Sequence, residues 1–433
     1  MNKSIFFAFL FLLPGCNKER GTDSPKEIDQ IAEDYVRLAL VIGQYDVSFV
    51  DAYYGPDSLK PTTSQANIFP KDSLLMAVQN LKTEADEVFK ADSISPMAIR
   101  AGWISDQLTS FDRRIKIFSG EYGSFDEESK DLFGAAAPVF DEKHFQELAE
   151  QLNRLLPGTG TISSRFQALA NRFIIPKNKL DTVFRAAIAE CRKRTLQHYA
   201  LPESEDFKLE FVTDKSWSGY NWYKGNYQSV IQINTDINIF IDRAIDVGSH
   251  ESYPGHHVYN MLLEKNLYRE QSLLEISVYP LYSPQSLIAE GSANYGIDVV
   301  FPGTEKTAFA REVLLPLAGL DTTGVGLYFT ALQTKSKLNY IRNEVARGLF
   351  SGTMSEEEAL RWLQEYGLQN KETAAKSISF IRGQRSYVIN YNYGADLVAQ
   401  YIERMGGKSP EDRWRVFEKL LSNQIRIRDL KNN

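Results

Sequence analysis

The stretch "GSHESYPGHHVYNML", residues 248–262, decides how this chain is interpreted, because it holds three of the five histidines. A plain H-E-x-x-H helix carries two imidazoles one turn apart on the same face, with a glutamate beside them. His250 and Glu251 stand in that order here, but four residues instead of two precede the next histidine, His256. The stretch is therefore interpreted as an insertion variant of a metal-binding helix.

Pro254 prevents one straight helix from running through this stretch, because its ring would clash with the carbonyl of His250 and it has no N–H to donate. In an ideal helix, six residues at about 100° each would turn His256 onto a different face from His250. If Pro254 and Gly255 bulge outward, the excess is absorbed and His256 becomes the second ligand. His257 is the alternative ligand, because seven residues nearly complete two turns, although an axial rise of about 10 Å separates it from His250.

The third ligand has to come from elsewhere in the chain. A catalytic zinc site uses three protein ligands and one open position, and two histidines with a carboxylate are a common set. In "SPQSLIAEGSANYGIDVV" (283–300), predicted as a helix, Glu290 supplies the carboxylate and Asn294 could orient a histidine through its amide oxygen. Asp246, one turn before the first histidine, is another candidate for that supporting role. Glu251 then remains free to act as a general base on water, and the prediction is one Zn²⁺ per chain.

Most of the remaining sequence has the periodicity of amphipathic helices. The stretch "EIDQIAEDYVRLALVIGQYD" (27–46) repeats apolar residues at helical spacing. Helix starts are marked as well, by Ser355 with Glu358 three residues later and by Ser409 directly before Pro410. Helix is therefore the predicted state for the larger part of the chain.

An exception lies just before the histidines. "FKLEFVTD" (207–214) and "NYQSVIQINTD" (226–236) are rich in β-branched and aromatic residues and predict two short strands, separated by a turn-prone segment at 215–225. The predicted fold is α+β and mainly α-helical, with a small antiparallel sheet next to the helix that carries the histidines. The metal cleft is expected between two helical lobes, at about 28–200 and 201–433.

The first sixteen residues, "MNKSIFFAFLFLLPGC", have the pattern of an export signal. Lys3 precedes an apolar run that is too short to span a bilayer of about 30 Å as a helix. The ending resembles a bacterial lipoprotein box, which predicts a lipid anchor on Cys16 and a polar tether at 17–27 before a single domain at 28–433. We expect an exported, membrane-anchored lipoprotein, periplasmic or on the cell surface, or a secreted protein if the box is not used.

Composition excludes several classes of protein. Hydrophobic residues make up 43% of the 433 residues, which is typical of a globular protein. A formal net charge of −7 gives no electrostatic reason to expect a nucleic-acid partner. With Cys16 lipidated, only Cys191 would remain as a free thiol, so no intramolecular disulfide is expected. The chain has no G-x-S-x-G pattern, so nothing marks a serine hydrolase.

The segments "HESYPGHH" (250–257) and "EGSANYGID" (290–298) resemble the bacterial domain-of-unknown-function family 885. Its members carry an H-E-x-x-P-G-H-H segment and a later helix of the E-G-W-A type. The likeness extends to "LALVIGQYDVSFVDAYYGP" (38–56), "SWSGYNWYKGNYQSVIQINTD" (216–236) and "RGQRSYVINYNYG" (382–394). That family is similar to gluzincin-type zinc metallopeptidases, in which a glutamate is the third ligand.

The resemblance implies a division of roles in this chain. It assigns the metal to His250, His256 and Glu290, and base catalysis to Glu251. It also suggests that the phenol of Tyr387 reaches into the site, where its O–H could donate to the oxyanion of the reaction. Ordinary packing is the alternative role for Tyr387.

Substrate contacts are predicted on both sides of the metal. The strand "QSVIQIN" (228–234) is expected to pair with an extended substrate backbone as an edge strand, while Trp222 and Tyr223 flank side-chain pockets. Arg382 and Arg385 could bind a terminal carboxylate, which favours a carboxypeptidase, although solvated surface arginines are the alternative.

The function expected from the sequence is a zinc-dependent peptide hydrolase, with a peptide as its substrate. The alternative function is a non-catalytic, metal-containing lipoprotein that binds peptides. Both functions need the same helix and cleft, so the residues do not separate them.

Overall fold

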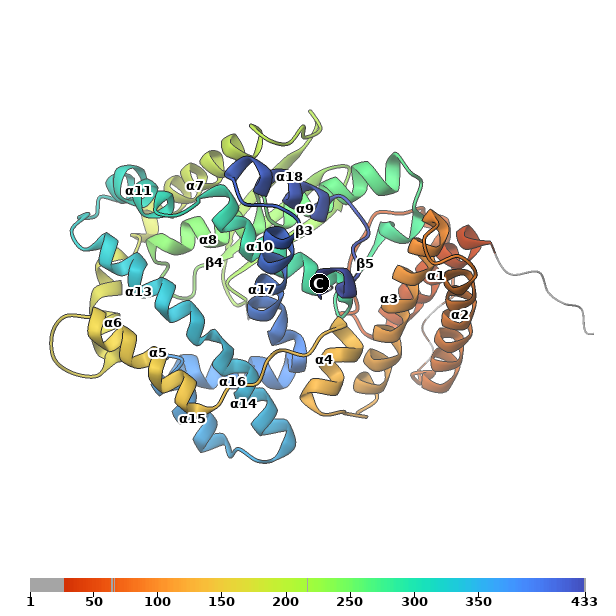
Figure 1. Ribbon diagram of the computed structural model, residues 1–433, viewed down its shortest axis with the longest axis horizontal. Helices are drawn as coiled ribbons and strands as arrows, with labels where there is room; N and C mark the ends of the chain where they lie inside the picture. Colours follow the sequence, from red (N-terminus) through yellow and green to blue (C-terminus); the bar gives the residue numbers. More distant parts are fainter. Residues whose placement is uncertain (1–26, 64, 66, 216, 432–433) are drawn as a thin grey trace, which may run out of the picture.

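The computed structural model describes residues 27–63, 65, 67–215 and 217–431 (Figure 1). The chain is mainly helical with two small sheets, which confirms the predicted α+β class. The predicted signal segment, Cys16 and all but the last residue of the predicted tether lie outside the described residues. None of the helices in the described part of the chain combines the length and the apolar character needed to cross a membrane.

The first half of the chain is almost entirely helical. Its elements are α1 (Ile28–Tyr45), β1 (Val50–Tyr53), α2 (Lys71–Ala91), α3 (Pro96–Phe118), α4 (Phe125–Phe133), α5 (Glu142–Leu155), α6 (Ile162–Ala170) and α7 (Leu180–Thr195). Burial in α1 follows the predicted apolar stripe, since Ile28, Ile31, Tyr35 and Ile42 are all buried.

The second half begins with strands and returns to helices. Its elements are β2 (Asp206–Val212), β3 (Gly219–Gly225), β4 (Gln228–Asn234), α8 (Ile241–Glu251), α9 (His256–Leu263), β5 (Val278–Pro280), α10 (Pro284–Val300), α11 (Glu305–Phe309), α12 (Leu315–Ala318), α13 (Val325–Lys337), α14 (Ile341–Ser351), α15 (Glu356–Glu365), α16 (Lys371–Gln384), α17 (Ile389–Arg404), α18 (Pro410–Leu421) and α19 (Ile427–Lys431). The predicted starts are confirmed: Ser355 and Glu358 form a capping box, and Ser409 caps α18.

The sheet before the histidines differs from the expected hairpin of two strands. Residues 219–225, predicted as part of a turn, form β3, and the strand order is β2-β4-β3. β3 and β4 are antiparallel, whereas β2 and β4 are parallel, so the sheet is mixed. Asn226 and Tyr227, both with positive φ, make the two-residue reversal between β3 and β4. The sequence predicts a turn at 219–225 because the reversal at Asn226 and Tyr227 lacks the usual Asn-Gly pair that marks a hairpin.

The strand order also corrects the predicted edge strand. β4 is the central strand, hydrogen-bonded on both sides, so its backbone cannot pair with a substrate. β3 is an edge strand instead, and a second sheet of two antiparallel strands joins β1 to β5. The free edge that was expected on β4 therefore belongs to β3, its hairpin partner.

The helix that enters the histidine stretch stops where Pro254 requires it to stop. α8 ends at Glu251, the Tyr253–Pro254 peptide is cis, and α9 begins at His256. Gly255 lies so close to the end of α8 that a Cβ on it would stand 1.9 Å from the carbonyl oxygen of His250. Only glycine fits there, and the close turn brings the start of α9 back beside the end of α8.

α10 runs through the middle of the molecule beside α17 (Figure 1). A Cβ on Gly291 would lie 2.5 Å from the carbonyl group of Gly394, so the two helices pack backbone against backbone. The buried apolar side chains form one continuous cluster from Ile28 to Leu430. The division into two lobes at about residue 200 stays a prediction.

Candidate metal centre

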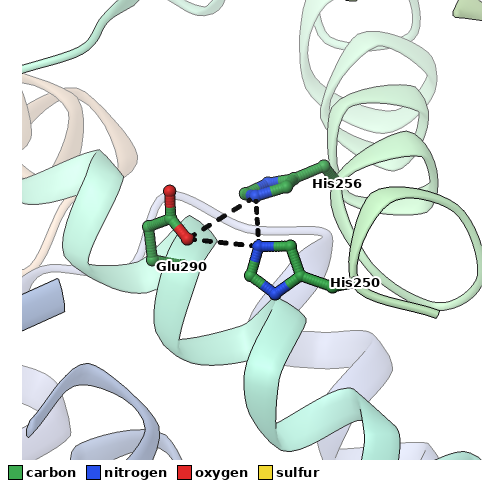
Figure 2. Close-up of side chains that lie close together, drawn as sticks. All are labelled: His250, His256 and Glu290. Atoms are coloured by element: carbon green, nitrogen blue, oxygen red, sulfur yellow. Dashed lines mark hydrogen bonds and ion pairs between the residues drawn. The ribbon is translucent and has the colours of Figure 1, made fainter. Parts of the chain in front are cut away.

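Three side chains from three helices point toward one another (Figure 2). His250 comes from the last turn of α8, His256 is the first residue of α9, and Glu290 lies in α10. The Nε2 atoms of the two histidines are 3.1 Å apart. The Oε2 atom of Glu290 lies 3.2 Å from the Nε2 of His250 and 3.7 Å from the Nε2 of His256. We call these three residues the metal group, because each offers one ligand atom and these atoms lie within 4.8 Å of one another.

The spacing of the metal group suits a small tetrahedral cation. Zinc bonds to nitrogen and oxygen of about 2.0–2.2 Å, at tetrahedral angles, place neighbouring ligand atoms about 3.3 Å apart. The three separations of 3.1, 3.2 and 3.7 Å scatter around that value. Within the described residues, the buried Oε2 of Glu290 has no hydrogen-bond partner, so its lone pairs stay available to a cation. The donor set and its geometry therefore fit zinc.

Asn294 holds His250 in the tautomer that a ligand needs. The amide nitrogen of Asn294 donates to the backbone oxygen of Tyr391 at 3.0 Å, which turns its Oδ1 toward the Nδ1 of His250 at 3.1 Å. An acceptor at Nδ1 keeps the imidazole proton there, so the lone pair is at Nε2 and faces the metal group. Asn294, one turn after Glu290, is therefore in contact with a histidine of the metal group, and its supporting role stays a prediction.

Tyr387 holds the other half of the Glu290 carboxylate. Its hydroxyl donates to Oε1 of Glu290 at 3.0 Å, and the side chain is buried. Oε1 is therefore occupied while Oε2 faces the histidines. The predicted phenol does reach the site, but its hydrogen bond goes to the carboxylate rather than to a position where a substrate oxyanion would form.

The electrostatics of the metal group favour a positive charge at its centre. Burial alone would lower the pKa of His256, but the close, negatively charged carboxylate of Glu290 outweighs it and raises that pKa to about 9. Burial alone would raise the pKa of Glu290, but the two histidines hold it well below its usual range. The centre therefore calls for a proton or a metal cation at neutral pH.

Glu251 lies beside the metal group without belonging to it. Its carboxyl is buried, and burial raises its pKa while His250 and His256 oppose that shift. The amide of Asn221 donates to its backbone oxygen at 2.7 Å, which ties the end of α8 to β3. A Cβ on Gly219 would lie 3.0 Å from Oε1 of Glu251, so a glycine lets the edge strand pass next to the carboxylate. The predicted base therefore sits between the metal group and an edge strand.

His257 is turned away from the metal group, which corrects its role as alternative ligand or supporting residue. Its Nε2 lies 3.1 Å from Oε2 of Glu205, and its Nδ1 lies 2.8 Å from Oγ of Ser229. Both ring nitrogens are therefore occupied. His257 points away from His256 because successive residues of a helix point in directions about 100° apart. Asp246 likewise interacts elsewhere, 3.5 Å from Nζ of Lys306, and not with a ligand histidine.

Both arginines predicted to bind substrate are engaged with carboxylates. Arg382 is exposed and pairs with Glu356, as a surface arginine does. Arg385 is mostly buried and makes two 2.7 Å bonds to the fully buried Glu128, so it neutralises an internal charge. Neither guanidinium is free for a substrate, which removes the argument for a carboxypeptidase that rested on them.

The two aromatic residues predicted to flank substrate pockets lie on opposite faces of β3. Tyr223 is buried and its hydroxyl bonds to Glu264, so it does not line a pocket. Trp222 is half-buried and packs at 4.4 Å on the ring of Tyr220, whose hydroxyl bonds to Asp51. A substrate role for Trp222 stays a prediction.

The sequence did not single out three residues near the metal group. Tyr391 lies one turn after Tyr387 and is 37% exposed, and within the described residues its hydroxyl makes no hydrogen bond. Asp51 and Tyr220 form a hydrogen-bonded pair between β1 and β3, in which burial raises the pKa of Asp51 to about 6. The four-residue spacing of the two tyrosines was the signal for Tyr391, whereas nothing in the spacing connects Asp51 with Tyr220.

Comparison with known proteins gives likeness of fold without a close relative. No family model matches the chain, and no curated protein matches it. Two solved bacterial proteins named as putative lipoproteins are similar: one from Colwellia psychrerythraea (TM-score 0.50, 14% identity, 83% of this chain and 69% of that chain) and one of unknown function from Shewanella oneidensis (TM-score 0.48, 12% identity, 83% and 72%). An M32 carboxypeptidase from Deinococcus radiodurans R1 matches with a TM-score of 0.40 and 11% identity over 90% of this chain and 89% of that chain. At these identities, the Colwellia structure shows a shared fold and nothing finer.

Proposed function

We propose that this protein is a zinc-dependent peptide hydrolase that acts outside the cytoplasm. The observation that carries the proposal is the convergence of His250 Nε2, His256 Nε2 and Glu290 Oε2 within 4.8 Å, next to the buried carboxyl of Glu251. Two histidines and a glutamate are a common ligand set of catalytic zinc sites, which keep one position open. Asn294 and Tyr387 orient two of the three ligands.

Each remaining residue of the site has a definite task in this proposal. When bound, zinc would polarise the scissile carbonyl and make a water more acidic. Glu251 accepts the proton of that water and returns it to the leaving nitrogen. Tyr391, a partly exposed residue in electrostatic range of Glu251 and Glu290, donates a hydrogen bond from its hydroxyl to the oxyanion in place of Tyr387. The edge strand β3 binds the extended peptide backbone.

The location of the protein follows from the sequence pattern alone. Residues 1–16 carry the export signal, and a lipid on Cys16 would hold the protein at a membrane. Export would be lost on deletion of residues 1–16, and a Cys16→Ala variant would appear in the soluble fraction. A Cys16→Ala variant that stays with the membrane would contradict the anchor.

Elemental analysis combined with peptide cleavage tests the proposed function. The wild-type chain should hold one zinc and cleave members of a mixed peptide library, and His250→Ala should lose both. Glu251→Gln should keep the zinc while cleavage falls about 10² to 10⁴-fold, the usual contribution of a general base. His198→Ala is the matched control, because His198 is exposed and lies outside the metal group.

Two results would contradict the proposal in different ways. A chain that takes up no zinc under zinc-replete conditions would leave the metal group as a structural cluster. A chain that holds zinc and binds peptides without cleaving any of them would be the non-catalytic, metal-containing peptide-binding lipoprotein.

A further inference from the structure

Three cationic side chains from separate helices interact electrostatically with one another. Arg243 lies on α8, seven residues before His250, so the two residues share a face of that helix about 10 Å apart along its axis. Lys335 lies near the end of α13 and Arg342 at the start of α14. All three side chains are half-buried. We call Arg243, Lys335 and Arg342 the cationic cluster.

The cationic cluster lacks the carboxylate partners that other buried arginines of this protein have. Within the described part of the chain, Arg342 and Lys335 form no ion pair, and the buried Nε of Arg342 has no hydrogen-bond partner. The hydroxyl of Ser218 is 3.5 Å from a guanidinium nitrogen of Arg243, a weak contact. By contrast, Arg385 makes two bonds to Glu128. Because buried charges are normally paired, the missing partner points to a ligand.

Asp242, a buried carboxyl in electrostatic range of the cationic cluster, is engaged by another residue. Asp242 accepts a hydrogen bond of 2.5 Å from Tyr328, and burial together with the nearby Asp246 raises its pKa, which disfavours its negative charge. Burial and the charges of Arg342 and Arg243 lower the pKa of Lys335 to about 8, against the opposing charge of Asp242. The three cations therefore repel one another with only partial compensation from Asp242, and an anion bound among them would reduce that repulsion.

Tyr391 connects the cationic cluster with the metal group. It interacts electrostatically with Arg342 on one side and with Glu251 and Glu290 on the other. Its backbone oxygen accepts the hydrogen bond of Asn294, the residue that orients His250. Arg243 is in electrostatic range of the Glu251 carboxyl as well. An anion held by the cationic cluster would thus lie next to a peptide bond placed over the metal group.

We propose that the cationic cluster is a subsite for a carboxylate of the substrate, with Arg342 as its principal ligand. The inference rests on the proposed hydrolase function and names its substrate class: a peptide with a carboxylate on the leaving side of the cleaved bond. A free C-terminus is one source and an acidic side chain the other. The guanidinium offers several N–H donors to either, and no ion pair among the described residues occupies them. Arg342 takes the role that the sequence suggested for Arg382 and Arg385.

Binding of matched peptides to a zinc-loaded Glu251→Gln chain tests the subsite without requiring hydrolysis. Titration calorimetry would compare three N-acetylated tripeptides: one with a free C-terminal carboxylate, the same sequence with a C-terminal amide, and an amide that ends in glutamate. We expect at least one carboxylate-bearing peptide to bind at least ten-fold more tightly than the neutral amide. The preferred peptide identifies the source of the carboxylate.

The same titration on variants shows which residue is responsible for the preference for a carboxylate-bearing peptide over the neutral amide. Glu251→Gln/Arg342→Ala should bind acid and amide within about two-fold, and Glu251→Gln/Arg342→Lys should keep an intermediate preference. Glu251→Gln/Lys335→Met, which preserves the length of the side chain, should lower the preference several-fold. Glu251→Gln/Arg361→Ala is the matched control, because Arg361 pairs with Glu142 and Glu365 at the surface. Circular dichroism melting and zinc content establish that each variant is folded and loaded.

The outcomes separate this inference from the proposed function. Equal binding of all three peptides by the Glu251→Gln chain, or an undiminished preference after Arg342→Ala, would overturn the subsite even if the wild-type chain cleaves peptides. A preference that depends on Arg342 in a chain that cleaves no peptide would support the subsite and contradict the hydrolase.

Discussion

Two buried clusters of histidine and glutamate lie on either side of the start of α9, and adjacent residues supply them. His256 joins His250 and Glu290, while His257 joins Glu205. The residue types are the same and both clusters are largely removed from solvent. The two clusters nevertheless differ in how completely their polar atoms are hydrogen-bonded, and this difference suits them to different roles.

In the Glu205 cluster both carboxylate oxygens of Glu205 and both ring nitrogens of His257 have partners. Arg192 donates two bonds to Oε1 of Glu205, and Tyr253 donates to Oε2 at 2.5 Å beside His257. In the metal group the Oε2 atom of Glu290 has no donor among the residues that the structure describes, and two imidazole Nε2 atoms face each other at 3.1 Å. A saturated cluster stabilises the fold, whereas an unsaturated one is suited to bind a cation.

The largest expected effect is the difference in zinc affinity between a His256→Ala and a His257→Ala variant. His256→Ala should reduce zinc affinity on the order of 10³-fold, since each ligand contributes a large share of a total of about 10–16 kcal/mol. His257→Ala should keep one zinc per chain. Competition with a zinc chelator measures both affinities. Loss of zinc from His257→Ala and not from His256→Ala would reverse the assignment of the two clusters.

The stability of the fold should respond in the opposite way. His257→Ala removes buried hydrogen bonds to Glu205 and Ser229 and leaves a cavity, so the free energy of unfolding should fall by about 3 to 4 kcal/mol. Urea denaturation of the zinc-free chain measures this loss, with His198→Ala as the exposed control. A loss below about 1 kcal/mol would mean that the Glu205 cluster does not stabilise the fold.

The pH dependence of the free energy of unfolding tests the stabilising role of Glu205. Burial alone would raise its pKa, but hydrogen bonds from His257, Tyr253 and Arg192 lower that pKa to about 2. The ionised carboxyl therefore contributes stability above its unfolded pKa of about 4.3, and this contribution is lost as the pH falls toward 2. The wild type should exceed Glu205→Gln by about 3 kcal/mol at pH 7 and lose this advantage below pH 4. The exposed Glu357→Gln should show no such pH dependence.

The smallest expected effect concerns the hydroxyl of Tyr387. Tyr387→Phe removes the 3.0 Å bond to Oε1 of Glu290 and keeps the buried ring. Loss of such a supporting bond costs about 10 to 100-fold in metal affinity, and the fold should be preserved. Tyr282→Phe is a fair control, because Tyr282 packs against Tyr387 but bonds to Gln384. An unchanged zinc affinity would show that Oε1 needs no support.

Much of the candidate site could be predicted from the sequence because its signals are local. The order of His250, Glu251 and Pro254 predicted a helix that ends, and the structure ends α8 at Glu251. Glu290 and Asn294, one turn apart in a predicted helix, are brought to the same histidine. The fold class was predictable for the same reason, since helical spacing and caps are properties of neighbouring residues.

Other parts of the site depend on contacts between distant segments. Arg382 and Arg385 look equivalent in sequence, but only the second meets a buried glutamate, 257 residues away along the chain. The partner of Tyr387 and the unpaired state of Arg342 within the described residues were equally hidden, because no periodicity records which helix packs on which. The sequence predicts a turn at 219–225, whereas the structure has a strand there. Pairing with β4, and not local propensity, makes these residues a strand.

By itself, the sequence determined that two histidines flank a helix break, because a proline and a glycine act on the backbone within one turn of their own position. It also determined that a later helix carries a carboxylate and an amide on one face. Only the tertiary structure decided that His256 faces Glu290 while His257 faces Glu205, and that the Nε of Arg342 has no hydrogen-bond partner among the described residues. The physical reason is that the direction and pairing of a buried side chain are set by the surface packed against it, which comes from segments far along the chain.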